Sequence, residues 1–250
     1  MFTTLTVNGN RPVLGSFSKG TEGSVTLNFA TSGGINCDKW CLYHPASINP
    51  LAVTLSTSAR CYAHRKETRK DRSQLYAKLK RHEEMPQHLV VSRAMAEVDM
   101  LVASGHRIPW FRFSAFGSVP NIPPHNFWNL VKRLVTLNIP VHLPVETFDK
   151  AKVYRFALGN LNVAVRQSIT DPAQWTTTPG AVSVVAGNMG MKFQQRIALA
   201  KTMAAARRTS TGRKTIVCPA VVSRNNPKAK CGSCTACANP EMDVVYPMHG

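Results

Sequence analysis

Four cysteines near the carboxyl end constrain this chain more than any other feature. Cys218 stands before Pro219, and after a twelve-residue loop Cys231, Cys234 and Cys237 follow at two successive C-x2-C spacings. The residues between the last three are Gly, Ser, Thr and Ala, whose small side chains let the backbone turn tightly around one centre. Thiols rarely crowd in this way without a metal. The spacing therefore predicts that the four sulfurs share one metal centre.

The identity of the metal stays open between two kinds of site. Ferredoxin-type clusters are held by closely spaced thiolates, with a fourth ligand from elsewhere in the chain. Zinc more often takes two C-x2-C pairs, although a four-thiolate zinc site also fits this spacing. We favour an iron–sulfur cluster of the 4Fe–4S type as the cofactor, with zinc as the alternative.

The remaining cysteines, Cys37, Cys41 and Cys61, predict a second metal site near the amino end. The run Cys37-x3-Cys41-x2-His44 resembles the C-x3-C-x2-C loop of radical S-adenosylmethionine enzymes, in which three thiolates hold a cubane cluster and leave one iron open for the cofactor. Here the third position is His44, so either His44 or Cys61 completes the site. An imidazole ligand raises the cluster potential, which counts against the strongly reducing chemistry that cleaves the cofactor. A zinc knuckle or a structural clamp is the alternative, and S-adenosylmethionine binding would be a further step.

The charge of the chain is extreme, because 31 Lys and Arg stand against 13 Asp and Glu, a net charge of +18. Such a field attracts polyanions, of which nucleic acid is the commonest. Basic residues also cluster beside both cysteine groups, and a solvated helix face is the alternative reading of the first cluster. The predicted nucleic-acid contacts are Arg65, Lys66, Arg69, Lys70, Arg72, Arg207 and Arg208.

The chain shows no secretory leader and no apolar run long enough to span a bilayer. Seven cysteines, an odd number, argue against a pure disulfide framework. We therefore expect a cytoplasmic protein with reduced thiols and no membrane partner; its oligomeric state stays open. No linker stands out, so one domain over 1–250 is expected, with N-terminal strands at 1–36, a cysteine loop at 37–66, a βα core at 67–217 and a cysteine-rich segment at 218–250.

Short apolar strands alternate with amphipathic helices through most of the chain. This alternation predicts an α/β fold, either an incomplete (βα) barrel or an open parallel sheet. We expect helices at Gln87–Ser104, Asn126–Leu137, Glu146–Ala157 and Phe193–Arg207, besides one that ends near His82. The expected strands are Phe2–Val7, Ser24–Phe29, Ile108–Phe113, Ile139–Leu143, Leu161–Val165, Ala181–Ala186 and Thr215–Val217.

The order of the cysteines, with Cys61-Tyr62-Ala63 upstream and Cys218-Pro219 downstream, resembles the pattern of a phage-borne family, the gene-product-eighty-eight-like proteins. The segment Phe111–Gly117 is similar to a degenerate version of the family's central strand without its acidic residue, and Asn162–Ser168 is similar to a family strand that ends in Ser. The resemblance covers most of the chain from about Lys19. It implies a half barrel like the core of radical S-adenosylmethionine enzymes, bound metal and, for a phage-encoded protein, the host cytoplasm. It implies no reaction.

Three functions fit these features. The first is an iron–sulfur enzyme of radical-like architecture that acts on a nucleic acid or nucleotide. The second is a non-catalytic nucleic-acid-binding protein stapled by zinc or clusters, and the third is a cluster-based redox sensor. No hydrolase, zincin or kinase motif occurs, and no pair of the scarce carboxylates has the pattern of an acid and a base. We favour an iron–sulfur protein with nucleic acid as its partner; catalysis stays open, and no catalytic residue is assigned.

Overall fold

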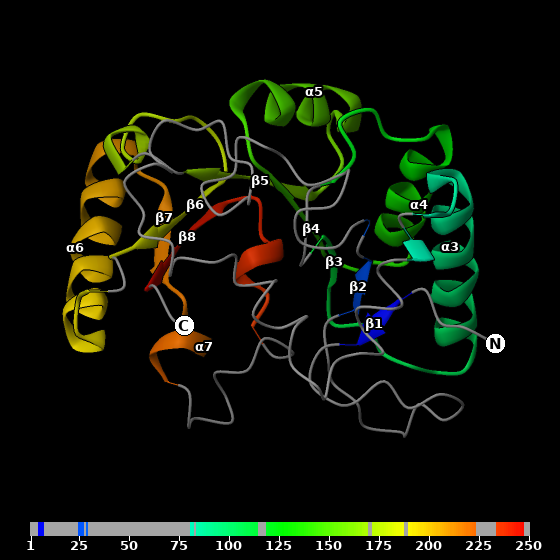
Figure 1. The fold of residues 1–250 in the computed structure, drawn as a ribbon, viewed down its shortest axis with the longest axis horizontal. Helices are drawn as coiled ribbons and strands as arrows, with labels where there is room; N and C mark the ends of the chain where they lie inside the picture. Colours follow the sequence, from blue (N-terminus) through cyan, green and yellow to red (C-terminus); the bar gives the residue numbers. More distant parts are fainter. Residues whose placement is uncertain are drawn as a thin grey trace. The chain divides into compact units, whose positions relative to one another are not determined.

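The computed structural model describes residues 5–7, 25–27, 29, 81–82, 84–114, 119–169, 172–187, 190–223 and 234–247. The chain divides into two compact units, Met1–Val141 and His142–Gly250 (Figure 1). The single domain expected over 1–250 stays a prediction beside this division. No helix within the described ranges is both long enough and apolar enough to cross a bilayer.

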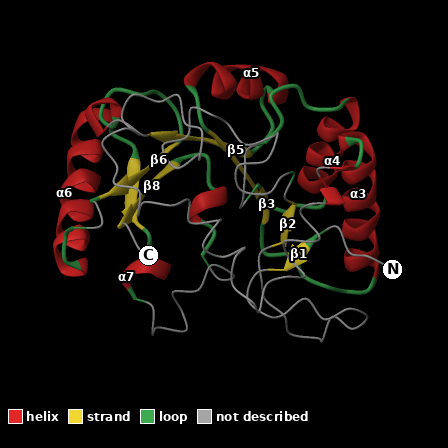
Figure 2. Ribbon diagram, viewed as in Figure 1, coloured by secondary structure: helices red, strands yellow, loops and turns green. Residues whose placement is uncertain are grey.

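Strands and helices alternate in both units, and most strand pairings among the described residues are parallel (Figure 2). The predicted α/β fold with open parallel strands is confirmed. In the second unit the described strands are ordered β4 (Val141–Val145), β5 (Val163–Ile169), β6 (Val182–Ala186), β8 (Met242–Pro247) and β7 (Lys214–Val217), so they form an open row that ends at β7.

The first unit contains the described strands β1 (Thr6–Val7), β2 (Val25–Leu27) and β3 (Phe111–Phe113), with the helices α3 (Gln87–Ala103) and α4 (His125–Thr136). The short strand β1 pairs antiparallel with β2, and β2 pairs parallel with β3. Both strands expected near the amino end are therefore present, in shorter form. The segment Phe111–Gly117 is a strand as far as Phe113, and its residues 115–118 lie outside the described part.

Helices α3 and α4 pack against each other in the first unit. The Asn126 side chain at the start of α4 donates to the His88 carbonyl at 2.7 Å and to Ser92 Oγ at 2.8 Å, which ties the two helices together. Beneath them the rings of Phe113 and Phe127 lie 4.8 Å apart between centroids, in a core that also holds Phe29 and Phe111. Aromatic side chains bury large areas, so this cluster supplies much of the apolar burial of the unit.

The second unit is built around a sheet that α6 covers on one face. Its elements are β4 (Val141–Val145), α5 (Phe148–Leu158), β5 (Val163–Ile169), the short turn η3 (Pro172–Gln174), β6 (Val182–Ala186), α6 (Phe193–Thr211), β7 (Lys214–Val217), α7 (Pro219–Val222), η5 (Ala236–Ala238) and β8 (Met242–Pro247).

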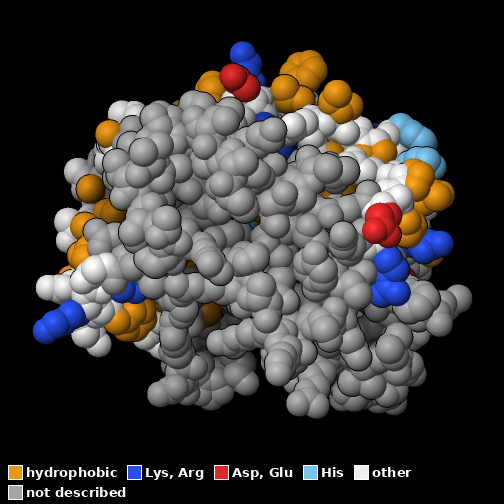
Figure 3. All heavy atoms as spheres, viewed as in Figure 1, with side chains coloured by type: hydrophobic (Ala, Val, Ile, Leu, Met, Phe, Trp, Pro, Cys, Tyr) orange, Lys and Arg blue, Asp and Glu red, His pale blue; other side chains and the backbone are white. Residues whose placement is uncertain are grey.

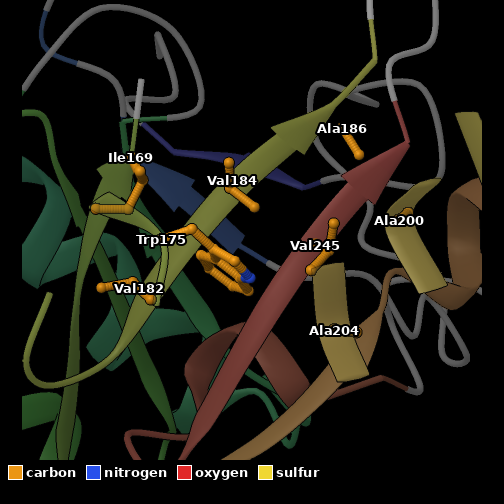
Figure 4. Close-up of a cluster of buried hydrophobic side chains, with 8 residues drawn as sticks. All are labelled: Ile169, Trp175, Val182, Val184, Ala186, Ala200, Ala204 and Val245. Atoms are coloured by element: carbon orange, nitrogen blue, oxygen red, sulfur yellow. The ribbon is translucent and has the colours of Figure 1, made fainter. Parts of the chain in front are cut away.

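Small residues of α6 let the helix lie close to the strands. Ala200 and Ala204 pack with Val184 and Val245 of the sheet and with Trp175 (Figure 4). The indole Nε1 of Trp175 donates to the Met203 carbonyl at 2.8 Å. The Trp175 ring is almost fully buried, so its polar atom needs this partner.

Helix α6 runs four residues beyond its predicted end. The sequence predicted Phe193–Arg207, but the helix continues to Thr211 and stops at Gly212, which has a φ of 67°. Ser and Thr in the last turn lowered the apparent helix propensity. In the structure the Thr211 hydroxyl donates to the Arg207 carbonyl at 2.7 Å, so it supports the last turn.

Strand β8 was not predicted, because 218–250 was expected to be a cysteine-rich segment without a strand. The structure inserts β8 between β6 and β7, parallel to both. Its apolar pattern is interrupted by Asp243, a fully buried residue, and by Pro247 at its end. A carboxylate in the middle of a sheet is not expected from sequence unless its partners are known.

Those partners are two arginines. Arg207 Nε lies 2.9 Å from Asp243 Oδ2 and Arg213 Nε lies 3.2 Å from the same oxygen, while Oδ1 accepts the Val182 N–H at 3.0 Å. Arg207 is itself fully buried and also donates to the Trp175 carbonyl at 2.6 Å. Burial lowers the pKa of neighbouring Arg155, the charge of Arg213 lowers it further, and Asp243 opposes both.

We expect the substitution Asp243→Asn to lower the free energy of unfolding by about 3 kcal/mol or more, because it leaves the buried Arg207 charge unbalanced. The matched control is Asp99→Asn, which breaks the ion pair with Arg133 at 2.8 Å, where both side chains are 45% exposed. Exposed pairs contribute less than about 1 kcal/mol. Urea denaturation measures both variants, and equal losses would contradict the role given to Asp243.

Candidate metal centre

Cys218 lies at the carboxyl end of β7, the last strand in the order of the sheet, which pairs with β8. It follows Val217, the last residue of β7, and its N–H donates to the Val245 carbonyl of β8 at 2.8 Å. The residue is buried, and α7 begins at the next position with Pro219. Open parallel sheets bind ligands beyond the carboxyl ends of their strands. Cys218 therefore occupies a position at which this fold class places functional groups.

Cys237 packs in the same region as Cys218, although it lies much later in the sequence. It lies in η5, and its Sγ is 3.0 Å from the hydroxyl oxygen of Tyr246, near the end of β8. Cys218 and Cys237 belong to one small packed cluster. The cluster joins buried Cys218, Val221 and Val244 with partly buried Phe193, Ile216, Ala220, Cys237 and Tyr246. Two of the four predicted ligands, nineteen positions apart in the sequence, are thus brought together.

Of the other two predicted ligands of this centre, one lies within the described residues. Cys234 is partly exposed and lies three residues before Cys237, just ahead of the turn in which the Ala238 N–H donates to the Thr235 carbonyl at 2.9 Å. Cys231 lies outside the described residues. None of Cys218, Cys234 and Cys237 forms a disulfide with another described residue. Within the described ranges no group of three or more Cys, His, Asp or Glu side chains is arranged to hold a metal.

A fully buried arginine fixes the turn that carries Cys237. The Arg166 side chain extends from the middle of β5, and all three of its nitrogens donate to carbonyl oxygens. Its contacts are Nη1 to Val182 (2.9 Å) and Met242 (2.7 Å), Nη2 to Ala236 (3.1 Å), Asn239 (3.1 Å) and Cys237 (3.2 Å), and Nε to Cys237 (3.3 Å). The turn is therefore held to the sheet through its backbone, which leaves its side chains to other partners.

Side-chain alternation along the strands places the cysteine cluster on the sheet face opposite the one that Ala200 and Ala204 of α6 cover, although Phe193 at the start of α6 also packs against the cluster. Successive side chains of a strand point to opposite faces. Val245 packs toward α6, so its neighbours Val244 and Tyr246 lie on the opposite face, with the cysteine cluster. Ile169 likewise faces the α6 side, which places Arg166 with η5. Two thiols thus lie in one cluster on this face, and Cys234 stands three residues before one of them in the sequence.

The predicted amino-terminal site lies outside the described residues. Cys37, Cys41, His44 and Cys61 all fall in that part, and so do Arg65, Lys66, Arg69, Lys70 and Arg72 of the predicted nucleic-acid contacts. For these residues the sequence-based expectations stay predictions.

The two remaining basic residues differ in exposure. Arg207 is fully buried and paired with Asp243, so it has no surface to offer a phosphate, and we remove it from the predicted contacts. Arg208 is exposed, with a single long contact of 3.5 Å to the Thr215 carbonyl, and its contact stays a prediction. In the view of Figure 3 the Lys and Arg side chains of the described residues are scattered over the surface and form no continuous patch.

Arg166 and Tyr246 were not predicted as parts of the site. The sequence placed Arg166 only in the segment Asn162–Ser168, which is similar to a strand of the phage-borne family. It gave Tyr246 no role. A sequence signal existed for the arginine, since a single charge after the apolar run Val163-Ala164-Val165 needs a buried partner. No comparable signal marks Tyr246, because a tyrosine in a strand is ordinary.

Comparison with known proteins gives no match for this chain, neither to a family model, nor to a curated protein, nor to a solved structure.

Proposed function

We propose that the protein is a metal protein in which Cys218, Cys231, Cys234 and Cys237 hold a 4Fe–4S cluster, with nucleic acid as its partner. The observation that supports the centre is the packing of Cys218 and Cys237 into one cluster at the ends of β7 and β8. Zinc on the same four thiolates is the alternative, since the donor atoms suit both metals.

The residues around the thiols each have a part in such a centre. Arg166 fixes the backbone of the cysteine turn, and Pro219 begins the short helix that leads away from Cys218. The Tyr246 hydroxyl lies within hydrogen-bond distance of Cys237 Sγ and would donate to it once the sulfur is a thiolate. Hydrogen bonds to ligand sulfurs tune the potential of a cluster, and a bound cluster would supply electron transfer.

The finer architecture is part of the same proposal. Open parallel strands with a cysteine at their carboxyl ends support a half barrel like the core of radical S-adenosylmethionine enzymes, as the resemblance to the phage-borne family implies. We also propose the second site at Cys37, Cys41 and Cys61, with His44 or S-adenosylmethionine at its open position. We assign no catalytic residue.

Anaerobic purification tests the metal centre most simply. The protein should be brown, with about four iron and four acid-labile sulfide per cluster. The Cys237→Ser variant should lose the cluster of this centre, and Cys61→Ser should lose only metal bound at the amino-terminal site. A colourless protein that carries stoichiometric zinc would show that the metal of this centre is zinc and not iron. Wild-type metal content in Cys237→Ser would contradict the carboxyl-terminal centre.

The nucleic-acid partner is supported by the charge of the chain rather than by one surface. A net charge of +18 favours polyanions, and the exposed Arg208 adds a cation close to the cysteine segment in the sequence. Phosphate contacts of Lys and Arg release counterions, so the affinity should fall steeply as salt rises.

A salt series on binding tests that partner. Changing Arg69 and Lys70 to Gln should lower the slope of log K against log salt by about one to two units, for all sequences alike, because phosphate contacts carry no base information. The matched control changes Lys132 and Arg133, both exposed on α4, to Gln and removes the same charge. Its slope should equal that of the wild type. Equal slopes in all three proteins would contradict phosphate contacts at Arg69 and Lys70.

A further inference from the structure

Among the described residues of the second unit two arginines are fully buried, and they differ in how their charge is balanced. Arg207 forms an ion pair with Asp243. Arg166 donates only to carbonyl oxygens, and no carboxylate of the described residues contacts it. The two side chains lie on opposite faces of the same strands, since Arg207 belongs to α6 and Arg166 reaches η5.

Carbonyl oxygens satisfy the N–H groups of Arg166 but do not cancel its charge. A buried charge without an opposite charge costs several kcal/mol, even after the protein relaxes around it. The chain nevertheless keeps this arginine in the core, at 0% exposure. Its position is therefore best explained by a negative group that the protein holds close to it.

The cysteine turn is a source of such a group, because Arg166 binds its backbone directly. Three of the carbonyls that Arg166 binds belong to Ala236, Cys237 and Asn239. The thiol of Cys237 is on the same turn, and Cys218 packs in the same cluster. Four thiolates around a divalent zinc ion or a 4Fe–4S core leave a net negative charge, so either centre would balance the guanidinium.

We propose that Arg166 is the positioning residue of this centre: its charge compensates an anionic thiolate–metal group, and its N–H donors shape the turn that presents Cys237. This inference rests on the proposed function, because it needs a metal on the carboxyl-terminal cysteines. It adds that the group bound there is anionic and that its affinity depends on one buried cation.

Two substitutions of Arg166 distinguish a role for its positive charge from a role in anchoring the turn alone. Arg166→Lys and Arg166→Gln both lose donors, but only the lysine keeps the positive charge. The holoprotein of each variant is challenged with a chelator, and metal retention gives the relative affinity. We expect Arg166→Gln to bind metal at least tenfold more weakly than Arg166→Lys. If the metal is iron, the reduced-to-oxidised ratio at a fixed potential should fall about tenfold in Arg166→Gln, which is about 59 mV for one electron.

The matched controls are Arg207→Lys and Arg207→Gln, which change the other buried arginine without touching the cysteine turn. They should lower the stability of the protein, but the protein that folds should keep a metal affinity within about twofold of the wild type, because Arg207 contacts no residue of the cysteine turn. Equal affinities in Arg166→Gln and Arg166→Lys would overturn the inference, and so would losses in the Arg207 variants as large as those in the Arg166 variants. Should Arg166→Gln fail to fold, Arg166→Met supplies the neutral variant.

Failure of the proposed function has a different signature. If Cys237→Ser retains the full metal content of the wild type, no centre exists at these cysteines, and the proposed function fails together with the inference. If Cys237→Ser loses its metal while Arg166→Gln retains it as the wild type does, only the role of Arg166 is wrong.

Discussion

The arrangement of the second unit depends on the neutralisation of Asp243 inside the sheet. The carboxylate lies in β8, and its ion pairs with Arg207 and Arg213 let that strand run between β6 and β7. The opposite face of β8 then carries Tyr246 to the cysteine cluster. One buried ion pair on the α6 face thus supports the strand on which the candidate metal centre is built.

The regular elements were largely predictable, and the exceptions have a common physical cause. The helix α4 was predicted within one residue at each end, since its apolar residues recur with helical spacing and bury one face. The strand β8 was missed because Asp243 breaks its apolar pattern, and α6 was ended too early because Ser210 and Thr211 are weak helix formers. In both places, tertiary partners supply what the local sequence lacks: two arginines for Asp243, and the carbonyl of Thr176 for the Ser210 hydroxyl, at 3.2 Å.

The candidate site was likewise predictable only in part, because its arrangement depends on tertiary contacts. Spacing alone singled out Cys218 and Cys237, because thiols crowded among small residues have few other uses. It could not place them at the ends of β7 and β8, since that requires knowing that β8 is a strand. Arg207 was predicted to contact nucleic acid for a related reason. Basic residues near the end of a helix are usually exposed, and the sequence does not show that Asp243 is the buried partner of Arg207.

The central claim is that the carboxyl-terminal cysteines converge on one metal. X-ray absorption at the metal edge of the purified holoprotein tests it most directly, with the Cys61→Ser variant used to remove metal bound at the amino-terminal site. The account predicts a shell of sulfur atoms at about 2.3 Å, with an iron–iron distance in addition if the centre is a cluster. A first shell made only of nitrogen and oxygen would contradict it.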